Sequence, residues 1–125
     1  MPTTMRSGLF PVNGLPAAQL VRVRIFLLNT TNQSVRAQVE VNRLAGERKE
    51  LIASREVAVE GDRTEVVELD NVEGETVEVN VTTEDRDLIP GVAVVSIFTA
   101  DQSTSLEWWL SAGEFTPSPN ALLVS

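Results

Sequence analysis

The chain of 125 residues contains no cysteine, no histidine and no tyrosine. Histidine and cysteine supply the imidazole and thiolate groups of Ser-His-Asp triads, thiol nucleophiles and ordinary zinc, copper, haem and iron–sulfur sites. Their absence excludes those chemistries, together with disulfides, and leaves only carboxylate, hydroxyl, lysine and arginine chemistry. We therefore expect no catalytic residue and no cofactor, and we expect that the protein is not an enzyme.

Basic residues are also scarce, since 10 Lys and Arg stand against 18 Asp and Glu for a net charge of -8. Lys49 is the single lysine, and the arginines are scattered along the chain. A protein with a pI near 4.5 repels phosphate backbones and anionic lipid as a whole. Nucleic acid is therefore not an expected partner.

Long apolar runs are absent as well. No segment reaches the roughly 20 apolar residues that a membrane-spanning helix needs, so we expect no membrane insertion. The residues after Met1 lack the apolar stretch of a secretory signal. We expect cytoplasmic synthesis, with the spore or cell surface as the alternative final residence.

What the chain does have is alternation of apolar and polar residues. Val21, Val23, Ile25 and Leu27 alternate with Arg22, Arg24 and Phe26, which is the period of two that is typical of a strand. The same period recurs over 35–41 and most regularly over 76–83. Turn residues separate these runs, and the predicted strands begin near residues 20, 35, 50, 64, 76, 92 and 106.

Seven strands and no convincing helix predict an all-β protein, a single Ig-like Greek-key β-sandwich. A chain of 13.6 kDa is long enough for one core and too short for two. Residues 1–18 carry Pro2, Pro11 and Pro16 and are expected to form an N-terminal arm. The sandwich domain is expected over 19–115, followed by an extended C-terminal tail over 116–125.

Several segments together carry a resemblance to a known kind of protein. They are VRVRIFLLN, VRAQVEVNRL, TVEVNVTT, LIPGVAVVSIFTAD and LEWWLSAGEF. In this order the chain resembles small uncharacterised Ig-like or fibronectin-III-like β-sandwich proteins of spore-forming Firmicutes, over roughly Leu20 to Phe115. The resemblance implies a bacterial β-sandwich and supplies no catalytic or binding residues.

Two adjacent tryptophans are the most notable aromatic residues of the chain. Alternation places Trp108 in the core with Leu106 and Leu110, and Trp109 on the opposite face with Glu107. Trp109 is then covered by the arm or tail of its own chain, anchors a protein interface, or stacks on a sugar ring. With only six aromatic residues in the chain, a sugar platform is the weakest of the three.

The sequence also has more apolar surface than one core can use. Phe26 and Leu28 lie on the arginine face of the first predicted strand, and 92–98 is apolar on both faces. The tail carries Leu122, Leu123 and Val124, which we expect to dock beside Trp109 or on a neighbouring subunit. Because exposed apolar faces need a cover, we expect a homo-oligomer, with an unidentified protein partner as the alternative.

Carboxylates gather in two predicted loops. Glu84, Asp85 and Asp87 lie in one loop and Asp101 in the next, and calcium takes several oxygen ligands of this kind. No fixed ligand spacing is present, so solvated acidic loops are the simpler interpretation. The sequence thus predicts a self-associating, non-enzymatic interaction or structural module. The alternative is a surface-associated module that binds glycan through Trp109 or calcium through the acidic loop.

Overall fold

The computed structural model describes residues 2–15, 18–84, 87–98, 104–110 and 115–117. All regular secondary structure within these residues is β-strand, and the strands form two antiparallel sheets. The four-stranded sheet has the order β6(Thr64–Leu69), β3(Leu20–Asn29), β8(Leu88–Ile97), β9(Thr104–Leu110). The six-stranded sheet has the order β10(Thr116–Pro117), β1(Thr3–Arg6), β7(Thr76–Thr83), β4(Val35–Ala45), β5(Arg48–Val59), and β2(Phe10–Pro11) also pairs with β7.

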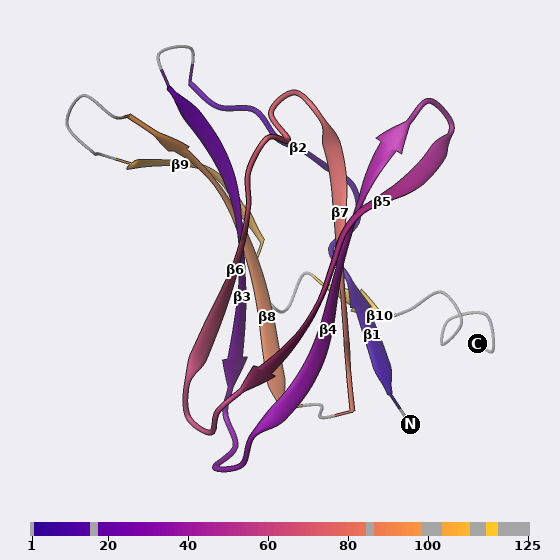
Figure 1. Cartoon of the computed structure of the whole chain (residues 1–125), viewed down its shortest axis with the longest axis vertical. Helices are drawn as coiled ribbons and strands as arrows, with labels where there is room; N and C mark the ends of the chain where they lie inside the picture. The colour runs from indigo at the N-terminus through magenta and orange to yellow at the C-terminus, as the bar shows by residue number, and fades with distance from the viewer. Residues whose placement is uncertain (1, 16–17, 85–86, 99–103, 111–114, 118–125) are drawn as a thin grey trace.

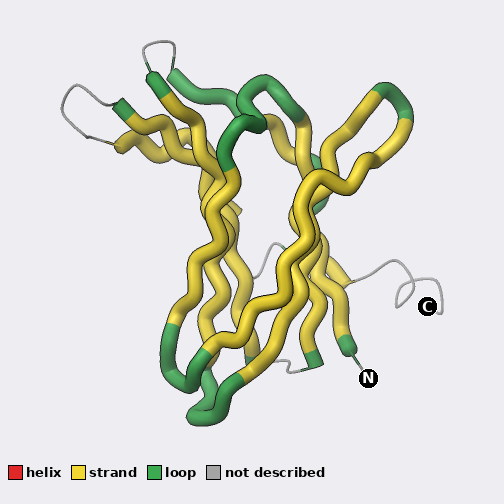
Figure 2. The backbone as a smooth tube through the Cα atoms, in the orientation of Figure 1, coloured by secondary structure: helices red, strands yellow, loops and turns green. Residues whose placement is uncertain are grey.

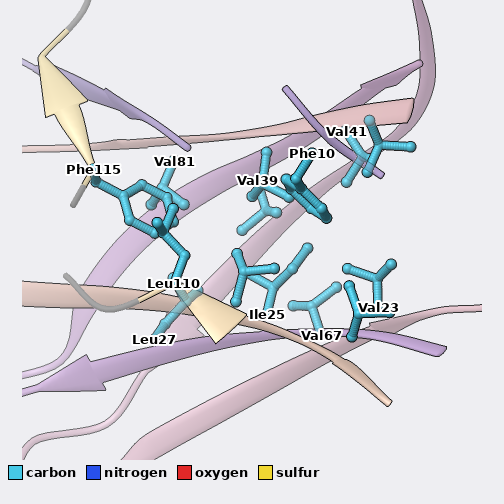
Figure 3. Packing of buried hydrophobic residues seen from close by; sticks show 14 of the residues in the cluster. Phe10, Val23, Ile25, Leu27, Val39, Val41, Val67, Val81, Leu110 and Phe115 are labelled. Atoms are coloured by element: carbon cyan, nitrogen blue, oxygen red, sulfur yellow. The ribbon is translucent and has the colours of Figure 1, made fainter. Parts of the chain in front are cut away.

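The two sheets face each other and enclose one hydrophobic core (Figures 1 and 2). Figure 3 shows Ile25 and Val67 of the four-stranded sheet opposite Phe10 and Val39 of the six-stranded sheet. The alternation seen in the sequence is confirmed, because the alternate apolar positions of 21–27, 35–41 and 77–81, from Val21 to Val81, are all buried, whereas Phe26 lies on the other face. Side chains of the intervening residues point to the outer face of each sheet, away from the core.

In the part that the structure describes, the N-terminal segment, expected from the sequence to form an arm over residues 1–18, adds two short strands to the six-stranded sheet. β1 pairs with β7 from Thr3 to Arg6, and β2 pairs with β7 at Phe10 and Pro11. Phe10 and Val12 are buried in the core. Two short strands interrupted by prolines have too little alternation to be predicted, yet their side chains complete the core.

The described strands number ten, more than the seven expected. The seven expected strands are present as β3 to β9, and the additional ones are the short β1, β2 and β10. β10 pairs Thr116 and Pro117 with β1, so the segment after Phe115 begins by extending the sheet. Residues 118–125 lie outside the described residues, and with them Leu122, Leu123 and Val124.

β8 begins four residues earlier than the sequence suggested and includes Pro90 and Gly91. Proline lacks the N–H that a central strand must donate, so it is confined to positions where a strand has one free side. In the described residues β9 pairs with β8 only from Val92 to Ile97, whereas β3 pairs with it along the whole of β8. Among the described residues, Pro90 therefore has a neighbouring strand on one side only, where β3 pairs with it at Leu27.

One end of the molecule is held by Asn29, which is completely buried. Its Nδ2 donates to the carbonyl oxygens of Gln33 and Val59, at 2.6 and 2.9 Å, and its Oδ1 accepts from the Thr31 backbone N–H at 2.9 Å. These bonds join the turn after β3 to the end of β5. Gly61 lies so close to this turn that a Cβ would be 2.5 Å from the Asn32 carbonyl carbon, which explains why a glycine is required there.

Candidate functional site

The outer face of the four-stranded sheet carries rows of facing side chains. One row runs from Glu68 on β6 through Arg24 and Ala93 to Trp109 on β9. The next row holds Val66, Phe26 and Gly91, and a third holds Arg22, Val95 and Leu106. In each row the residue with the smallest side chain is on β8, so the surface over β8 is lower than the surface over the strands beside it.

The low strand forms the floor of a groove of about 450 Å³. Gly91, Ala93 and Val95 form the floor; Arg24 and Phe26 form the β3 wall, and Leu106 and Trp109 form the β9 wall. Ala93 and Val95 are only 8% and 6% exposed although they point away from the core, because the walls rise above them. Trp109 and Leu106 are 59% and 57% exposed. The groove therefore joins a covered apolar floor to an exposed apolar wall.

Leu106 belongs to this wall and not to the core, so the expectation that it shares a face with Leu110 is wrong. A β-bulge between Val94 and Val95 pairs Val94 with Trp108 but Val95 with Leu106. The extra residue on β9 shifts the alternation by one position, which moves the residues before it to the other face. Leu110 is buried and Leu106 is exposed as a result. The side chain of Trp108 is outside the described part of the structure.

The interface candidates Phe26, Leu28 and Trp109 all lie on this outer face, but they are not equally placed. Phe26 and Trp109 line the groove together, whereas Leu28 lies one row beyond Phe26, beside the exposed Ile89. The described N-terminal strands β1 and β2 pair with β7 in the other sheet and so do not lie over Trp109. The sequence alone does not single out three residues of this face, Gly91, Val66 and Leu106. For Gly91 the sequence offers one signal, a glycine within an apolar run.

Charged residues of this face form compact ion pairs at one end of the groove. Arg22 Nε donates to Asp70 Oδ1 at 2.8 Å, and Arg24 Nε donates to Glu68 Oε2 at 2.9 Å. The hydrogen bond from Arg22 holds the pKa of the Asp70 carboxyl below its usual value, although desolvation acts in the opposite direction. Two cations and two anions thus neutralise one another on this face.

The outer face of the six-stranded sheet has a different composition. Its facing side chains are mainly polar and bond across strands, for example Arg36 to Glu56 at 3.1 Å and Gln38 to Ser54 at 3.2 Å. Thr4 and Thr82 share a hydrogen bond of 2.8 Å. This face therefore resembles the ordinary solvated side of a two-sheet protein.

The calcium candidates do not form a site in the described residues. Glu84 and Asp87 are both exposed, and the hydroxyl of Thr30 donates to the backbone carbonyl of Asp87 at 2.8 Å. Asp85 and Asp101 lie outside the residues that the structure describes. Within those residues, no group of three or more acidic, histidine or cysteine side chains is arranged to hold a metal ion.

Comparison with known proteins bears on the fold alone. No protein-family model matches the chain, and no curated protein matches it significantly. The chain is similar to a solved structure described as the crystal structure of Thermotoga maritima 1070, with a TM-score of 0.54 and 10% sequence identity over 87% of this chain and 95% of that chain. At this identity the likeness shows a shared two-sheet fold. Where residues are described, the structure also contains no helix long and apolar enough to cross a membrane.

Proposed function

We propose that the protein is a non-enzymatic interaction or structural module that self-associates through the outer face of its four-stranded sheet. The observation that carries this proposal is the groove, in which Ala93 and Val95 form an apolar floor on the side of a sheet that normally faces water. Contiguous exposed apolar surface of this kind marks interaction sites on soluble proteins. Trp109, an exposed aromatic at the rim, is the residue type most enriched among interface hot spots.

We further infer that the fold is an Ig-like Greek-key sandwich built on β3 to β9. The chain leaves β3, forms the β4–β5 hairpin in the other sheet, and returns as β6 to pair with β3. In a Greek key the fourth strand returns to lie beside the first of three consecutive strands, and β6 lies beside β3 in this way, although β4 and β5 belong to the other sheet. The later strands β7 and β8 pair with β4 and β3 in the same nested manner, which supports the assignment.

Charge supports a second copy as the occupant of this face. Two copies of a protein with a net charge of -8 repel each other unless they meet through a neutral surface. The described charges of the groove face are Arg22, Arg24, Glu68 and Asp70, which cancel. Two groove faces can therefore approach each other without the repulsion that the rest of the surface would impose.

The size of the face also suits a dimer. β3 and β8 are each ten residues long. β9 is seven and β6 six residues long. Strands rise about 3.3 Å per residue and lie about 4.8 Å apart, so these four strands give a face of about 500 Å². A standard interface buries about 800 Å² on each partner. The groove face can supply most of such an interface.

The alternative is a surface-associated ligand-binding module, and a single observation favours it. The exposed indole of Trp109 beside a groove is suited to stacking on a sugar ring. Glycan sites also need polar side chains that read hydroxyl groups, however, and Arg24 is the one polar residue among those that line the groove in the described structure. Titrating a glycan panel and calcium while following tryptophan fluorescence tests this alternative, which fails if neither ligand changes the signal.

Light scattering coupled to size exclusion tests the main proposal. The wild-type protein is expected to elute as a dimer or larger oligomer, and Phe26→Glu is expected to shift it to monomer because it places a charge in the apolar part of the groove. Ala58→Glu adds the same charge to the exposed outer face of β5 and should leave the oligomer intact. A wild-type protein that is monomeric at every concentration would overturn the proposal.

A further inference from the structure

A groove and a ridge lie side by side on the outer face of the four-stranded sheet. The groove runs along β8 over Ala93 and Val95, and the ridge is formed on β9 by Trp109 and Leu106. We propose that the ridge of a second copy of this chain docks into the groove, and that the groove of that copy receives the ridge of the first. This inference rests on the proposed self-association and identifies the contact that produces it.

The pairing of residues across β8 and β9 makes this arrangement self-complementary. Trp109 pairs with Ala93 and Leu106 pairs with Val95, so each ridge residue lies one strand away from a floor residue. A twofold axis that runs along the strands, midway between β8 and β9, exchanges these two positions. Because neighbouring strands are about 4.8 Å apart, this rotation places the second copy's Trp109 above Ala93 and its Leu106 above Val95.

The alternative twofold arrangements of the same face do not have this fit. An axis in the plane of the interface but across the strands leaves every strand above its own counterpart, so the ridge would meet the ridge. The exposed indoles would then hold the two sheets apart over the groove. The axis along the strands is therefore the one that fills the groove with side chains.

Gly91 provides the space that the docked indole requires. It continues the floor beyond Ala93, opposite Phe26, and among the described residues a Cβ built there would meet the Leu110 carbonyl oxygen at 3.6 Å and the Phe26 Cβ at 3.9 Å. Both distances are ordinary van der Waals contacts, so the described part of the chain leaves room for a side chain at this position, and its backbone does not require glycine. A glycine at an unstrained strand position is expected where another group approaches the backbone closely.

The β3 wall offers the docked indole a favourable partner. Arg24 lines the groove across from Trp109, and Glu68 holds its guanidinium through a hydrogen bond of 2.9 Å. An arginine over an aromatic ring attracts the ring electrostatically. The second copy's Trp109 would thus lie between Arg24 on one side and the indole of the first copy on the other, where offset aromatic contact is favourable.

Filling the floor without removing any ridge residue is the sharpest test. Gly91→Val adds a β-branched side chain that fits the strand but occupies the space of the docked indole. The dissociation constant, measured by sedimentation over a dilution series, is expected to rise at least about a hundredfold. Ala58→Val is the matched control, since it enlarges an exposed outer position of β5, and it should leave the constant unchanged.

A second variant removes the ridge in place of the floor. Trp109→Ala should raise the dissociation constant at least as much as Gly91→Val, while Leu51→Ala, which truncates a residue 52% exposed on the other sheet, should not change it. Circular dichroism melts of each variant confirm that the fold is intact. If Gly91→Val does not fold, Trp109→Ala and its control decide the matter.

The possible outcomes separate this inference from the proposed function. If Phe26→Glu dissociates the protein but Gly91→Val and Trp109→Ala associate like the wild type, the face is the interface and the ridge-in-groove contact is wrong. If the wild-type protein is a monomer, both proposals fall. If the full-length protein is a monomer, and deletion of residues 120–125 then exposes Trp109, the tail occupies the groove and a second copy does not.

Discussion

The outer faces of the two sheets differ sharply, although the strands that form them share the same alternation and the same core. On the six-stranded sheet the outer residues are polar along β7 and along β4 from Arg36 to Asn42, and Arg36 and Gln38 bond to Glu56 and Ser54 on β5. On the four-stranded sheet the outer residues of β8 are Gly91, Ala93 and Val95, which make no side-chain hydrogen bonds. The first face is suited to water and the second to a protein surface.

This difference shows that, in a two-sheet fold, the outer positions of the strands indicate which face contacts a partner. A two-sheet protein needs one apolar side on each sheet, and the core residues of both sheets are equally apolar here. The outer positions are free of that requirement, so their composition reflects what each face meets. An apolar outer face beside a polar one is therefore evidence of use, and each prediction below removes or tests one part of this contrast.

The largest effect is expected from making the groove face as polar as the other one. Phe26→Thr, Leu106→Thr and Trp109→Thr combined replace the walls by a residue that favours strands, so the fold should persist. Self-association should weaken by at least about a thousandfold, because the apolar contacts of both copies are lost together. Sedimentation velocity measures this change, and a triple variant that associates like the wild type would refute the functional contrast between the faces.

A smaller effect, on folding stability and not on self-association, is expected from removing the cation beside a buried carboxylate on the polar face. Glu78 is 4% exposed, and Lys49 Nζ donates to its Oε1 at 3.0 Å. Lys49→Met leaves this carboxylate buried without its cation and should lower the free energy of unfolding by about 1–3 kcal/mol. Self-association should be unaffected. Urea unfolding at a fixed protein concentration measures the loss.

The matched control for Lys49→Met is Arg36→Met. Arg36 pairs with Glu56 at 3.1 Å, and both side chains are well exposed, so its loss should cost less than about 0.5 kcal/mol. Adding Glu78→Gln to Lys49→Met should restore part of the stability, because the uncompensated charge is removed. Equal losses for Lys49→Met and Arg36→Met would show that burial of Glu78 contributes nothing.

A smaller loss of stability than that of Lys49→Met is expected at the ion pair of Arg22 and Asp70 on the groove face. The pKa of Asp70 is lowered in the folded protein, chiefly by its hydrogen bond from Arg22, so the pair stabilises the fold above the ordinary pKa of the carboxyl. That stabilisation is lost as the pH falls through the lowered value. Both side chains are partly exposed, so Asp70→Asn should cost less than about 1 kcal/mol at neutral pH.

The pH dependence distinguishes this ion pair from simple packing. The difference in stability between wild type and Asp70→Asn should shrink as acid protonates Asp70, and thermal melts over a series of acidic buffers measure it. A difference that stays constant down to strongly acidic pH would contradict an electrostatic origin.

The two-sheet β-fold and much of the core could be predicted from the sequence because alternation survives in the long strands. Val77, Val79 and Val81 alternate without interruption, and a strand with one polar face leaves no other interpretation. The short strands were missed for the opposite reason. Phe10 and Pro11 form a strand of two residues, which has no period to detect, and only the sheet explains why Phe10 is buried.

The candidate site was predicted in part. Phe26 and Trp109 could be singled out because each is a large apolar residue on the polar side of its strand. Leu106 could not, because a bulge depends on how two strands pair and leaves no mark in one of them. The groove itself needs Ala93 and Gly91 to lie between larger neighbours, and that neighbourhood exists only once β3 and β9 flank β8.

The central claim is that the groove face is covered in solution and the other outer face is not. Hydroxyl-radical footprinting of the full-length protein at its highest workable concentration and after extensive dilution tests it directly. The account predicts that Trp109, Leu106 and Phe26 are protected when concentrated and become reactive on dilution, while Leu51 reacts equally in both samples. Equal reactivity of Trp109 and Leu106 at both concentrations, with Leu51 behaving in the same way, would contradict it.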